Sequence, residues 1–374
     1  MPSLLLPLLL AQLQPPPSMW STLPACVSAT APITTPCTVP HRVTARQAKA
    51  RLRGRERAWW IVGDRLTMVA RPTDEKWILL CCSLQTPLVA IRGSDAGAVT
   101  VRVPRWREAV LALGTFPTGK QAADTYRGPD AEPVPSRLEV APETITTIDL
   151  PSGNLGGRRR VTVYVPAGTP IGSRLPALYL GDGSTRAFAP IAAAAVRDGR
   201  ARAAVLVGID AASSKDCGDC DARAGEYVPE FGADDPQGRY QRHQRFFIDE
   251  LLPYIEANYP VSSLRKDRTI GGYSNGAVWA LTTAERYPAL FGGALAMSAG
   301  AKSAADGAAR LKTVRVFAGA GVFEPSFYDR TSRAVAVAQA AGGEARFREV
   351  VGGHAQSTWD LIFADGYRWL FPAD

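Results

Sequence analysis

The segment Gly272-Tyr273-Ser274-Asn275-Gly276 constrains the fold most strongly, because it joins a strand pattern to a helix pattern. Residues 269–273 form a short β-prone run, and residues 275–287 have helical spacing that ends before Pro288. Ser274 would therefore stand on a tight strand-to-helix turn, where the two glycines relieve crowding. Because a hydroxyl becomes a good nucleophile only when a base takes its proton, this position predicts a nucleophile with a base nearby.

Strands and helices alternate across residues 140–374. Phe247, Leu251, Leu252 and Ile255 recur at helical spacing, which predicts an amphipathic helix over 240–258. Such alternation implies βαβ units and a mainly parallel sheet. We expect its strands at residues 161–165, 178–180, 203–207, 269–273, 293–297, 314–318 and 346–351.

The preceding part of the chain has a different pattern. Short β-prone runs at 66–70, 77–81, 99–103 and 109–113 are separated by turn residues, which predicts a small antiparallel β-sandwich over 41–120. Residues 121–139 are polar with several glycines and prolines and are predicted to be a linker. Residues 1–40 lack periodicity and are predicted to be a leader or a disordered segment.

The chain has 374 residues and a net charge of +8, with basic residues scattered apart from Arg158-Arg159-Arg160 and the stretch 42–57. This length suits one catalytic domain with a smaller companion. No nucleic-acid-binding module is recognisable, so we expect no nucleic-acid partner. A basic surface can still attract anionic substrates through its long-range field.

The N-terminus and the cysteines bear on cellular location. Residues 4–13 are mostly apolar but too short to span a bilayer, and they resemble a signal-peptide core without its positive flank. We expect a periplasmic or secreted protein; the alternative is a cytoplasmic one with a mis-assigned start. Cys217-Gly-Asp-Cys220 is a lone CxxC, which favours a small disulfide loop or two thiols over a metal site.

The chain has only three histidines, and their positions favour one as the base. His354 follows the last predicted strand, where the order serine, acid, histidine places the base. His41 lies in the predicted leader, and His243 lies on the helix over 240–258, where we expect it at the surface. The partner acid should follow the strand over 314–318, which favours Glu324. Asp329 and Asp360 are the alternatives.

Two backbone N–H groups are expected to bind the oxyanion of the reaction. The N–H of Asn275 lies at the start of the helix after Ser274, where the helix dipole is positive. A second donor should come from a loop after another strand, and Gly181-Asp182-Gly183-Ser184 follows the strand over 178–180. The N–H of Ser184 is the candidate; the alternative is an ordinary glycine-rich turn.

Several further motifs resemble those of one family. They are Ser152-Gly-Asn-Leu155-Gly156-Gly157-Arg158 before Val163-Tyr164-Val165-Pro166, Leu178-Tyr179-Leu180-Gly181-Asp182-Gly183, Arg223-Ala-Gly-Glu226-Tyr227-Val-Pro229, and Gly352-Gly353-His354 with Trp359. From about residue 126 to residue 371 the chain resembles the putative esterase family of α/β-hydrolases, especially enterochelin esterase-like proteins, and more distantly esterase D and the mycolyltransferases. The resemblance implies an α/β-hydrolase fold, the triad Ser274, Glu324 and His354, and oxyanion donors at Ser184 and Asn275.

We predict additional substrate contacts from Asp182, Arg223, Tyr273 and Trp359. Arg223 could hold an acidic or catecholate group through a bidentate contact, or it could pair with Glu226 or a nearby aspartate and order its loop.

The sequence therefore predicts a serine carboxylic-ester hydrolase that acts through an acyl-enzyme on a small-molecule ester, without a metal or organic cofactor. An acyltransferase using the same residues is one alternative. A non-catalytic protein that binds a glycan or a siderophore is the other.

Overall fold

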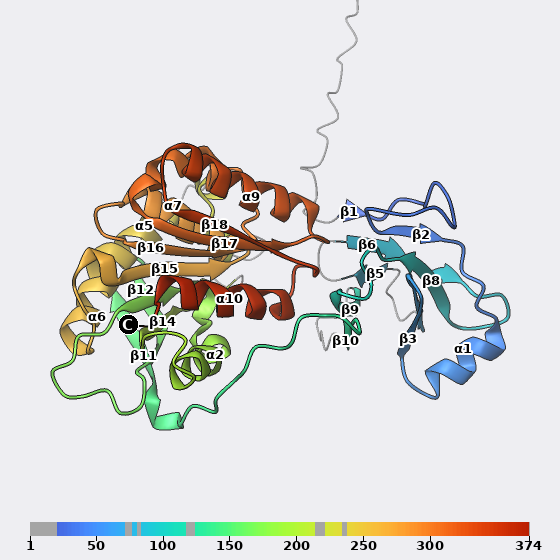
Figure 1. Cartoon of the computed structure of the whole chain (residues 1–374), viewed down its shortest axis with the longest axis horizontal. Coiled ribbons are helices and arrows are strands. Elements are labelled where there is room, and N and C mark those ends of the chain that lie inside the picture. The colour runs from blue at the N-terminus through green and yellow to red at the C-terminus, as the bar shows by residue number, and fades with distance from the viewer. Residues whose placement is uncertain are drawn as a thin grey trace, which may run out of the picture.

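The computed structural model describes residues 21–71, 77–80, 84–116, 124–213, 221–233 and 238–373. A β-rich N-terminal region and an α/β region lie beside each other (Figure 1). The segment after β18 (Ala345–Val350) meets β9 (Val110–Phe116) at a bridge between Gly352 and Val110. The α/β-hydrolase fold with a preceding small β-domain, which the sequence predicted, is confirmed.

The α/β region is built on an eight-stranded sheet with the order β11-β12-β14-β13-β15-β16-β17-β18. β12 is antiparallel to both of its neighbours, and the remaining pairs are parallel. Its strands are β11 (Ile145–Ser152), β12 (Gly157–Tyr164), β13 (Ala177–Leu180), β14 (Val205–Ile209), β15 (Arg268–Tyr273), β16 (Gly293–Met297), β17 (Arg315–Gly321) and β18 (Ala345–Val350).

The strand register brings the segments that follow β15, β16, β17 and β18 to one edge of this sheet. Tyr273 pairs with Met297, Met297 pairs with Gly319, and Gly321 pairs with Val350. Residues directly after parallel strands therefore meet at their carboxyl ends, where ligands bind in open α/β sheets.

Helices cover both faces of the sheet (Figure 1). One apolar cluster joins α7, α9 and the helices over 239–258 to the sheet, and another joins α2 and α10 to its opposite face. The helices of this region are α2 (Thr185–Arg197), α3 (Ala222–Tyr227), α4 (Pro229–Ala233), α5 (Arg239–Arg245), α6 (Leu252–Asn258), α7 (Asn275–Arg286), α8 (Ser303–Asp306), α9 (Pro325–Ala340) and α10 (Gln356–Leu370). Its 3₁₀ turns are η1 (Pro142–Thr144), η2 (Gly181–Gly183), η5 (Arg265–Asp267) and η6 (Ala308–Thr313).

The helix predicted over 240–258 contains a wider turn. A π-helical segment, η4 (Phe246–Leu251), lies between α5 and α6. Pro253 is at the start of α6, where it has no N–H to donate to the preceding turn, and its ring would clash with the carbonyl four residues earlier. The wider turn accommodates this defect while Phe247, Leu251 and Ile255 stay in the core.

The N-terminal region is a sandwich of two sheets, ordered β1-β6-β5-β9-β10 and β2-β8-β4-β3, with β7 also paired to β8. Side chains of β4, β8 and β9 fill the space between the sheets, and α1 (Ala45–Leu52) covers the outer face of the second. The strands are β1 (Ser21–Thr22), β2 (Cys37–Val39), β3 (Arg57–Val62), β4 (Arg65–Ala70), β5 (Trp77–Leu80), β6 (Leu84–Pro87), β7 (Val89–Ala90), β8 (Gly97–Arg102), β9 (Val110–Phe116) and β10 (Asp124–Arg127).

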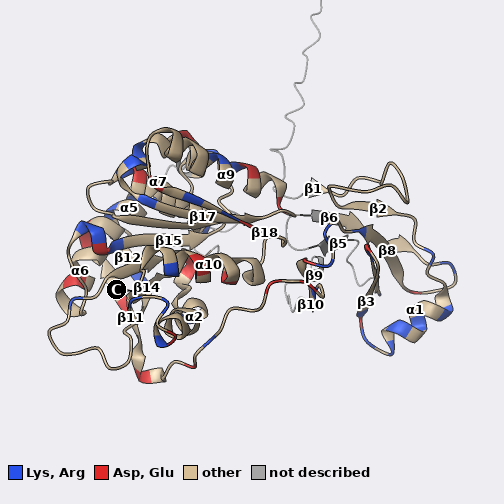
Figure 2. Cartoon of the chain, viewed as in Figure 1, with Lys and Arg blue, Asp and Glu red and all other residues tan. Residues whose placement is uncertain are grey.

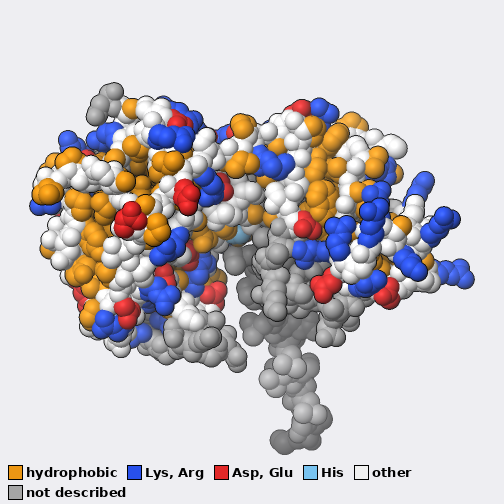
Figure 3. Space-filling model, turned by 90° about the horizontal axis from the view of Figure 1, so that it is seen from below, with side chains coloured by type: hydrophobic (Ala, Val, Ile, Leu, Met, Phe, Trp, Pro, Cys, Tyr) orange, Lys and Arg blue, Asp and Glu red, His pale blue; other side chains and the backbone are white. Residues whose placement is uncertain are grey.

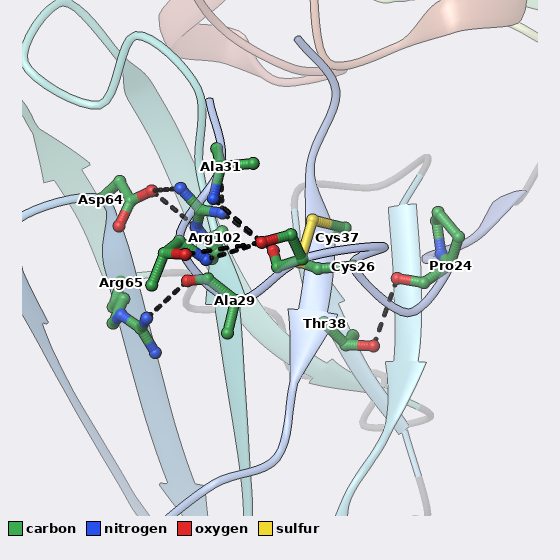
Figure 4. The surroundings of a disulfide bond; sticks show 11 residues. Pro24, Cys26, Ala29, Ala31, Cys37, Thr38, Asp64, Arg65 and Arg102 are labelled. Carbon is green, nitrogen blue, oxygen red and sulfur yellow. Dashed lines mark hydrogen bonds and ion pairs between the residues drawn. A yellow bond between two sulfur atoms is a disulfide. The ribbon is translucent and has the colours of Figure 1, made fainter. Parts of the chain in front are cut away.

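Strands β1 and β2 lie in residues that the sequence analysis assigned to a leader or disordered segment. A disulfide joins Cys26 to Cys37, and the guanidinium of Arg102 donates to the carbonyl oxygens of Ser28 and Ala31 (Figure 4). These long-range contacts, which no local pattern reveals, order the segment from Cys26 to β2 against β8, and β1 pairs with β6. Residues 1–20 and all of Cys81, Cys82, Cys217 and Cys220 lie outside the described residues.

Positive charge is concentrated at the end of the sandwich that carries α1. Residues 41–57 contain seven Lys and Arg and one Glu, which is a net +6 of the chain's +8. Their exposed side chains form a basic surface around α1 (Figures 2 and 3). The surface consists of Arg42, Arg46, Lys49, Arg51, Arg53 and Arg55.

His243 is completely buried, so the expectation of a surface position was wrong. Its ring packs against Tyr227, Phe246 and Trp279, because α3 and α7 cover this side of α5. Neither ring nitrogen has a hydrogen-bond partner among the described residues. Burial lowers the pKa of His243 to about 4, with Glu226 opposing that shift and Arg159 adding to it.

The depressed pKa makes the stability of the protein depend on pH. Between pH 6.5 and about 4 the unfolded chain takes up a proton at His243 that the folded chain excludes. The contribution of His243 to the free energy of unfolding should therefore be fully present above pH 6.5. It should fall by about 3 kcal/mol as the pH drops to 4. Urea unfolding at pH 7 and at pH 4 measures how much the free energy of unfolding changes between them. We expect His243→Phe to reduce this change by the contribution of His243. Equal pH dependence in the two proteins would contradict the assignment.

Among the described residues, none of the helices combines the length and the apolar character needed to cross a membrane.

Candidate active site

Ser274 lies directly after β15, at the first turn of α7. Its φ of 55° and ψ of −126° are unusual for a residue with a Cβ, and such strain is typical of an exposed nucleophile on a sharp turn. A Cβ added to Gly272 would lie 2.5 Å from the carbonyl oxygen of Gly276. The turn thus requires glycine at position 272, as the sequence pattern indicated.

The packing at Gly272 gives a testable consequence. Gly272→Ala would push its methyl group against the backbone of Gly276, and neither segment can give way without moving Ser274. Because a misplacement of about 1 Å costs roughly 100-fold, we expect kcat for an aryl ester to fall about 100-fold. Gly157→Ala, at a glycine with open space around it and no positive φ, is the control and should keep kcat. A Gly272→Ala enzyme with normal kcat would show that the turn tolerates a side chain.

His354 lies in the loop between β18 and α10, and its ring reaches both Ser274 and Glu324. Its Nε2 is 2.9 Å from the Oγ of Ser274, and its Nδ1 is 2.6 Å from Oε2 of Glu324. The ring packs on Phe327, with 4.0 Å between centroids. The three residues predicted from the sequence are therefore in one hydrogen-bonded line. His41, by contrast, accepts a hydrogen bond from the backbone N–H of Val43 in the sandwich region.

Glu324 follows β17 and is completely buried. Its Oε1 accepts hydrogen bonds from the backbone N–H of Gly321 and from the hydroxyl of Ser298, each at 2.6 Å. The two alternative acids are engaged elsewhere or exposed: Asp360 binds Arg137 and Gln356, and Asp329 is exposed on α9.

The sandwich contacts the loops that carry the acid and the histidine. The backbone N–H of Val110 in β9 donates to the carbonyl of Val351 at 2.8 Å. Phe323 and Val351 are buried in the apolar cluster of the sandwich. Arg105 pairs with Glu349 across the same contact at 2.6 Å. The residues next to Glu324 and His354 are therefore fixed in part by the N-terminal region.

The loop after β13 packs directly against the start of α7. A Cβ on Gly181 would lie 3.4 Å from Cα of Gly276 and 3.4 Å from the hydroxyl of Tyr227, which is ordinary van der Waals contact and shows how closely this loop approaches α7. Both the N–H and the hydroxyl of Ser184 donate to the carbonyl of Gly181, at 3.4 Å and 2.6 Å. The loop predicted to supply the second oxyanion donor is thus beside the nucleophile, and the roles of Ser184 and Asn275 stay predictions.

Asp182 and Arg223 bind each other. The guanidinium of Arg223 makes a bidentate pair with the carboxylate of Asp182 through Nε and Nη2. Burial alone would lower the pKa of Arg223, but the bonds and charge of Asp182 raise it above its ordinary value. Asp182 has φ of 60°, and its N–H donates to the hydroxyl of Tyr227 at 2.9 Å. Glu226, the other partner considered for Arg223, pairs with Arg159.

Tyr273 and Trp359 form a stacked pair beside His354. Their ring centroids are 4.1 Å apart, and the indole meets the imidazole edge-on at 5.1 Å. Burial raises the pKa of Tyr273 to about 12, and the charge of Asp182 adds to this shift. The indole N–H of Trp359 donates to the Oγ of Ser298 at 3.0 Å. Ser298 was missed by the sequence analysis, and its only sequence signal is its place directly after a buried strand.

No group of three His, Cys, Asp or Glu side chains that could hold a metal ion is found in the described part of the chain.

Residues 152–370, more than half of the chain, match the family described as Putative esterase. The chain belongs to this family. A search of curated proteins found no match. The esterase family assignment agrees with the resemblance that the motifs indicated.

Solved structures support the same fold. The ferric enterobactin esterase of Salmonella typhimurium is 19% identical, with a TM-score of 0.62 over 86% of this chain and 98% of its own. The enterobactin esterase of Shigella flexneri is 18% identical, with a TM-score of 0.63 over 86% and 97%. A ferulic acid esterase is 23% identical, with a TM-score of 0.52 over 62% and 98%. The first two likenesses extend beyond the matched family region into the sandwich. The family supports an esterase acting on a small-molecule ester, and these neighbours support the fold.

Proposed function

We propose that this protein is a serine carboxylic-ester hydrolase that uses Ser274, His354 and Glu324 as a catalytic triad. The observation that carries the proposal is the continuous line from the Oγ of Ser274 through His354 to Glu324, at 2.9 Å and 2.6 Å, in a member of an esterase family. Nucleophile and base within hydrogen-bond reach, with the base oriented by a third group, are the signature of an activated serine.

The proton positions follow from the geometry. For Nε2 of His354 to accept the proton of Ser274, its Nδ1 must carry the ring hydrogen, and Nδ1 faces Oε2 of the buried Glu324. Ser274 then attacks the ester carbonyl, and His354 holds the proton and passes it to the leaving alcohol. Glu324 stabilises the imidazolium during both steps. Water, activated by the same histidine, releases the acyl group.

The oxyanion is proposed to be held at the start of α7. The N–H of Asn275 belongs to the first turn of this helix, and its position next to Ser274 supports it as a donor. Ser184 is proposed as the second donor because its loop packs on Gly276. The backbone N–H of Ser184 donates to the carbonyl of Gly181 over a long 3.4 Å. This weak bond would be exchanged for one to the oxyanion that forms on the substrate.

The pairing of Arg223 with Asp182 supports a loop-ordering role for both residues. Asp182 has left-handed backbone geometry between Gly181 and Gly183, and the ion pair with Arg223 fixes it against α3. Tyr273 and Trp359 are half-buried beside His354 and are proposed to contact the substrate with their exposed edges.

The experiment that tests the function is hydrolysis of a short-chain aryl ester by the purified chain, with and without added alcohols. We expect acid and phenol in equal amounts, with little ester formed to the alcohol. Dominant transfer at low alcohol concentration would make the protein an acyltransferase, and no turnover of any ester would leave a binding protein. An enterobactin-type trilactone and feruloyl esters belong in the substrate panel, because the structural neighbours carry these names.

We also propose a periplasmic or secreted location. The disulfide between Cys26 and Cys37 supports it, because such bonds persist in oxidising compartments. Peptide mass mapping of the native protein without reductant should recover the two cysteines in one linked peptide. Free thiols at both positions would contradict the proposal.

A further inference from the structure

Ser298 lies between the acid and the aromatic pair of the site. It directly follows β16, and its φ of 59° places it in the left-handed region, which is costly for a residue with a Cβ. Its backbone N–H donates to the carbonyl of Gly319 at 2.8 Å, and its side chain is completely buried. Its hydroxyl is thus fixed at one point, 2.6 Å from Oε1 of Glu324 and 3.0 Å from Nε1 of Trp359.

The chemistry of these partners fixes the direction of both hydrogen bonds. An indole N–H can only donate, so the oxygen of Ser298 accepts from Trp359. The single hydrogen of the hydroxyl is then left for Glu324, whose oxygen accepts it. Trp359 in turn is held by its stack on Tyr273, the residue before the nucleophile. The chain of contacts therefore begins at Ser274 and ends at Tyr273, its neighbour on the same strand-to-helix turn.

We propose that Ser298 and Trp359 are positioning residues that act through Glu324: Trp359 orients the hydroxyl of Ser298, and Ser298 aligns the carboxylate with His354. This inference rests on the triad proposed above and extends it by two residues. Oε1 of Glu324 receives two hydrogen bonds, from Ser298 and Gly321, so Oε2 is presented to Nδ1 of His354. Without the hydroxyl, one backbone N–H alone would orient the carboxylate.

The test is steady-state kinetics of Ser298→Ala and Trp359→Phe with a short-chain aryl ester. Ser298→Ala keeps the Cβ, so the cost of the positive φ is unchanged, and it removes only the hydroxyl. Since a hydrogen bond to a charged group is lost, we expect kcat to fall about tenfold with KM unchanged. Trp359→Phe keeps a ring on Tyr273 and removes the N–H, and kcat should fall about fivefold, as for a lost neutral hydrogen bond. Ser298→Cys, with a weak donor, should recover part of the activity.

The decisive readout is whether these effects depend on Glu324. In a Glu324→Gln background, Ser298→Ala and Trp359→Phe should each change kcat by less than about twofold, because residues acting as a unit are not additive. Full tenfold and fivefold losses in that background would overturn the inference.

Thr283→Val is the matched control for lost stability. Thr283 is also completely buried, but it lies near the end of α7 that is farthest from Ser274, and its hydroxyl bonds to the side chain of Gln244. We expect it to lower the thermal midpoint about as much as Ser298→Ala while kcat stays the same. An equal loss of kcat in Thr283→Val, or a normal kcat in Ser298→Ala beside an inactive Ser274→Ala, would overturn the inference and leave the triad intact. Activity retained by Ser274→Ala would instead remove the proposed function.

Discussion

Ser274→Ala is expected to lower kcat for a short-chain aryl ester by about 10⁶-fold, the size of effect seen when the nucleophile of a triad is removed. The substitution deletes only the Oγ that faces His354 at 2.9 Å, and among the described residues Nε2 of His354 has no other hydroxyl partner. The φ of 55° at this position is equally costly for serine and alanine, so the fold should be unchanged.

Initial rates of the wild type and the variant would measure the loss of kcat, and their circular dichroism spectra would show whether the fold is unchanged. The control is Ser262→Ala, which removes another buried serine hydroxyl, one that donates to Asp267 at 2.7 Å outside the site. Its kcat should match that of the wild type. A Ser274→Ala enzyme with more than a few per cent of wild-type kcat would mean that the nucleophile lies elsewhere.

Glu324→Gln is expected to lower kcat about 10⁴-fold, because the new amide selects the wrong histidine tautomer. The N–H of Gly321 and the hydroxyl of Ser298 both donate to Oε1, so the amide oxygen would occupy that place. The amide NH₂ would then face Nδ1 of His354 and donate to it. The ring hydrogen would move to Nε2, which could no longer accept the proton of Ser274.

Asp329→Asn and Asp360→Asn are the matched controls for the acid. Asp329 is exposed on α9, and Asp360 is bound to Arg137 and Gln356. Both variants should keep kcat within about twofold, although Asp360→Asn loses part of a half-buried ion pair and should be less stable. A 10⁴-fold loss in either one, with an active Glu324→Gln, would assign the acid to that residue.

The residues that local pattern could identify were those next to parallel strands. The glycines around Ser274, the position of His354 after the last strand and that of Glu324 after β17 are all set by chain order. The structure brings these three side chains into contact because the register aligns the ends of β15, β17 and β18. Their catalytic roles remain proposals.

Features that depend on long-range packing were not predictable. Ser298 has no sequence signal that distinguishes it from any serine after a strand, and its bond to Glu324 spans 26 residues. His243 looked like a surface residue because its own helix is polar there, but Tyr227 of α3 and Trp279 of α7 pack on its ring. Strand β1 pairs with β6, and the segment from Cys26 to β2 is held by a disulfide and by Arg102; none of these contacts follows from the composition of residues 21–39.

The sequence limited the partner of Arg223 to a few candidates but did not identify it. Pairing with an aspartate or with Glu226 and contact with an acidic substrate were all chemically reasonable. In the structure Glu226 forms an ion pair with Arg159. Arg223 pairs with Asp182, because Asp182 lies on the loop after β13 and faces α3. This pairing fixes the loop that packs on the nucleophile.

The central claim is that Ser274 is the activated nucleophile. Covalent labelling with an alkyl fluorophosphonate, followed by peptide mass spectrometry, tests it most directly. Such a reagent reacts with a serine only when a base has activated it beside an oxyanion site. We predict one adduct per chain, located on Ser274, with loss of esterase activity in proportion to labelling and almost no labelling in His354→Gln. Complete inactivation with the adduct on another residue, or full activity after Ser274 is labelled, would contradict the account.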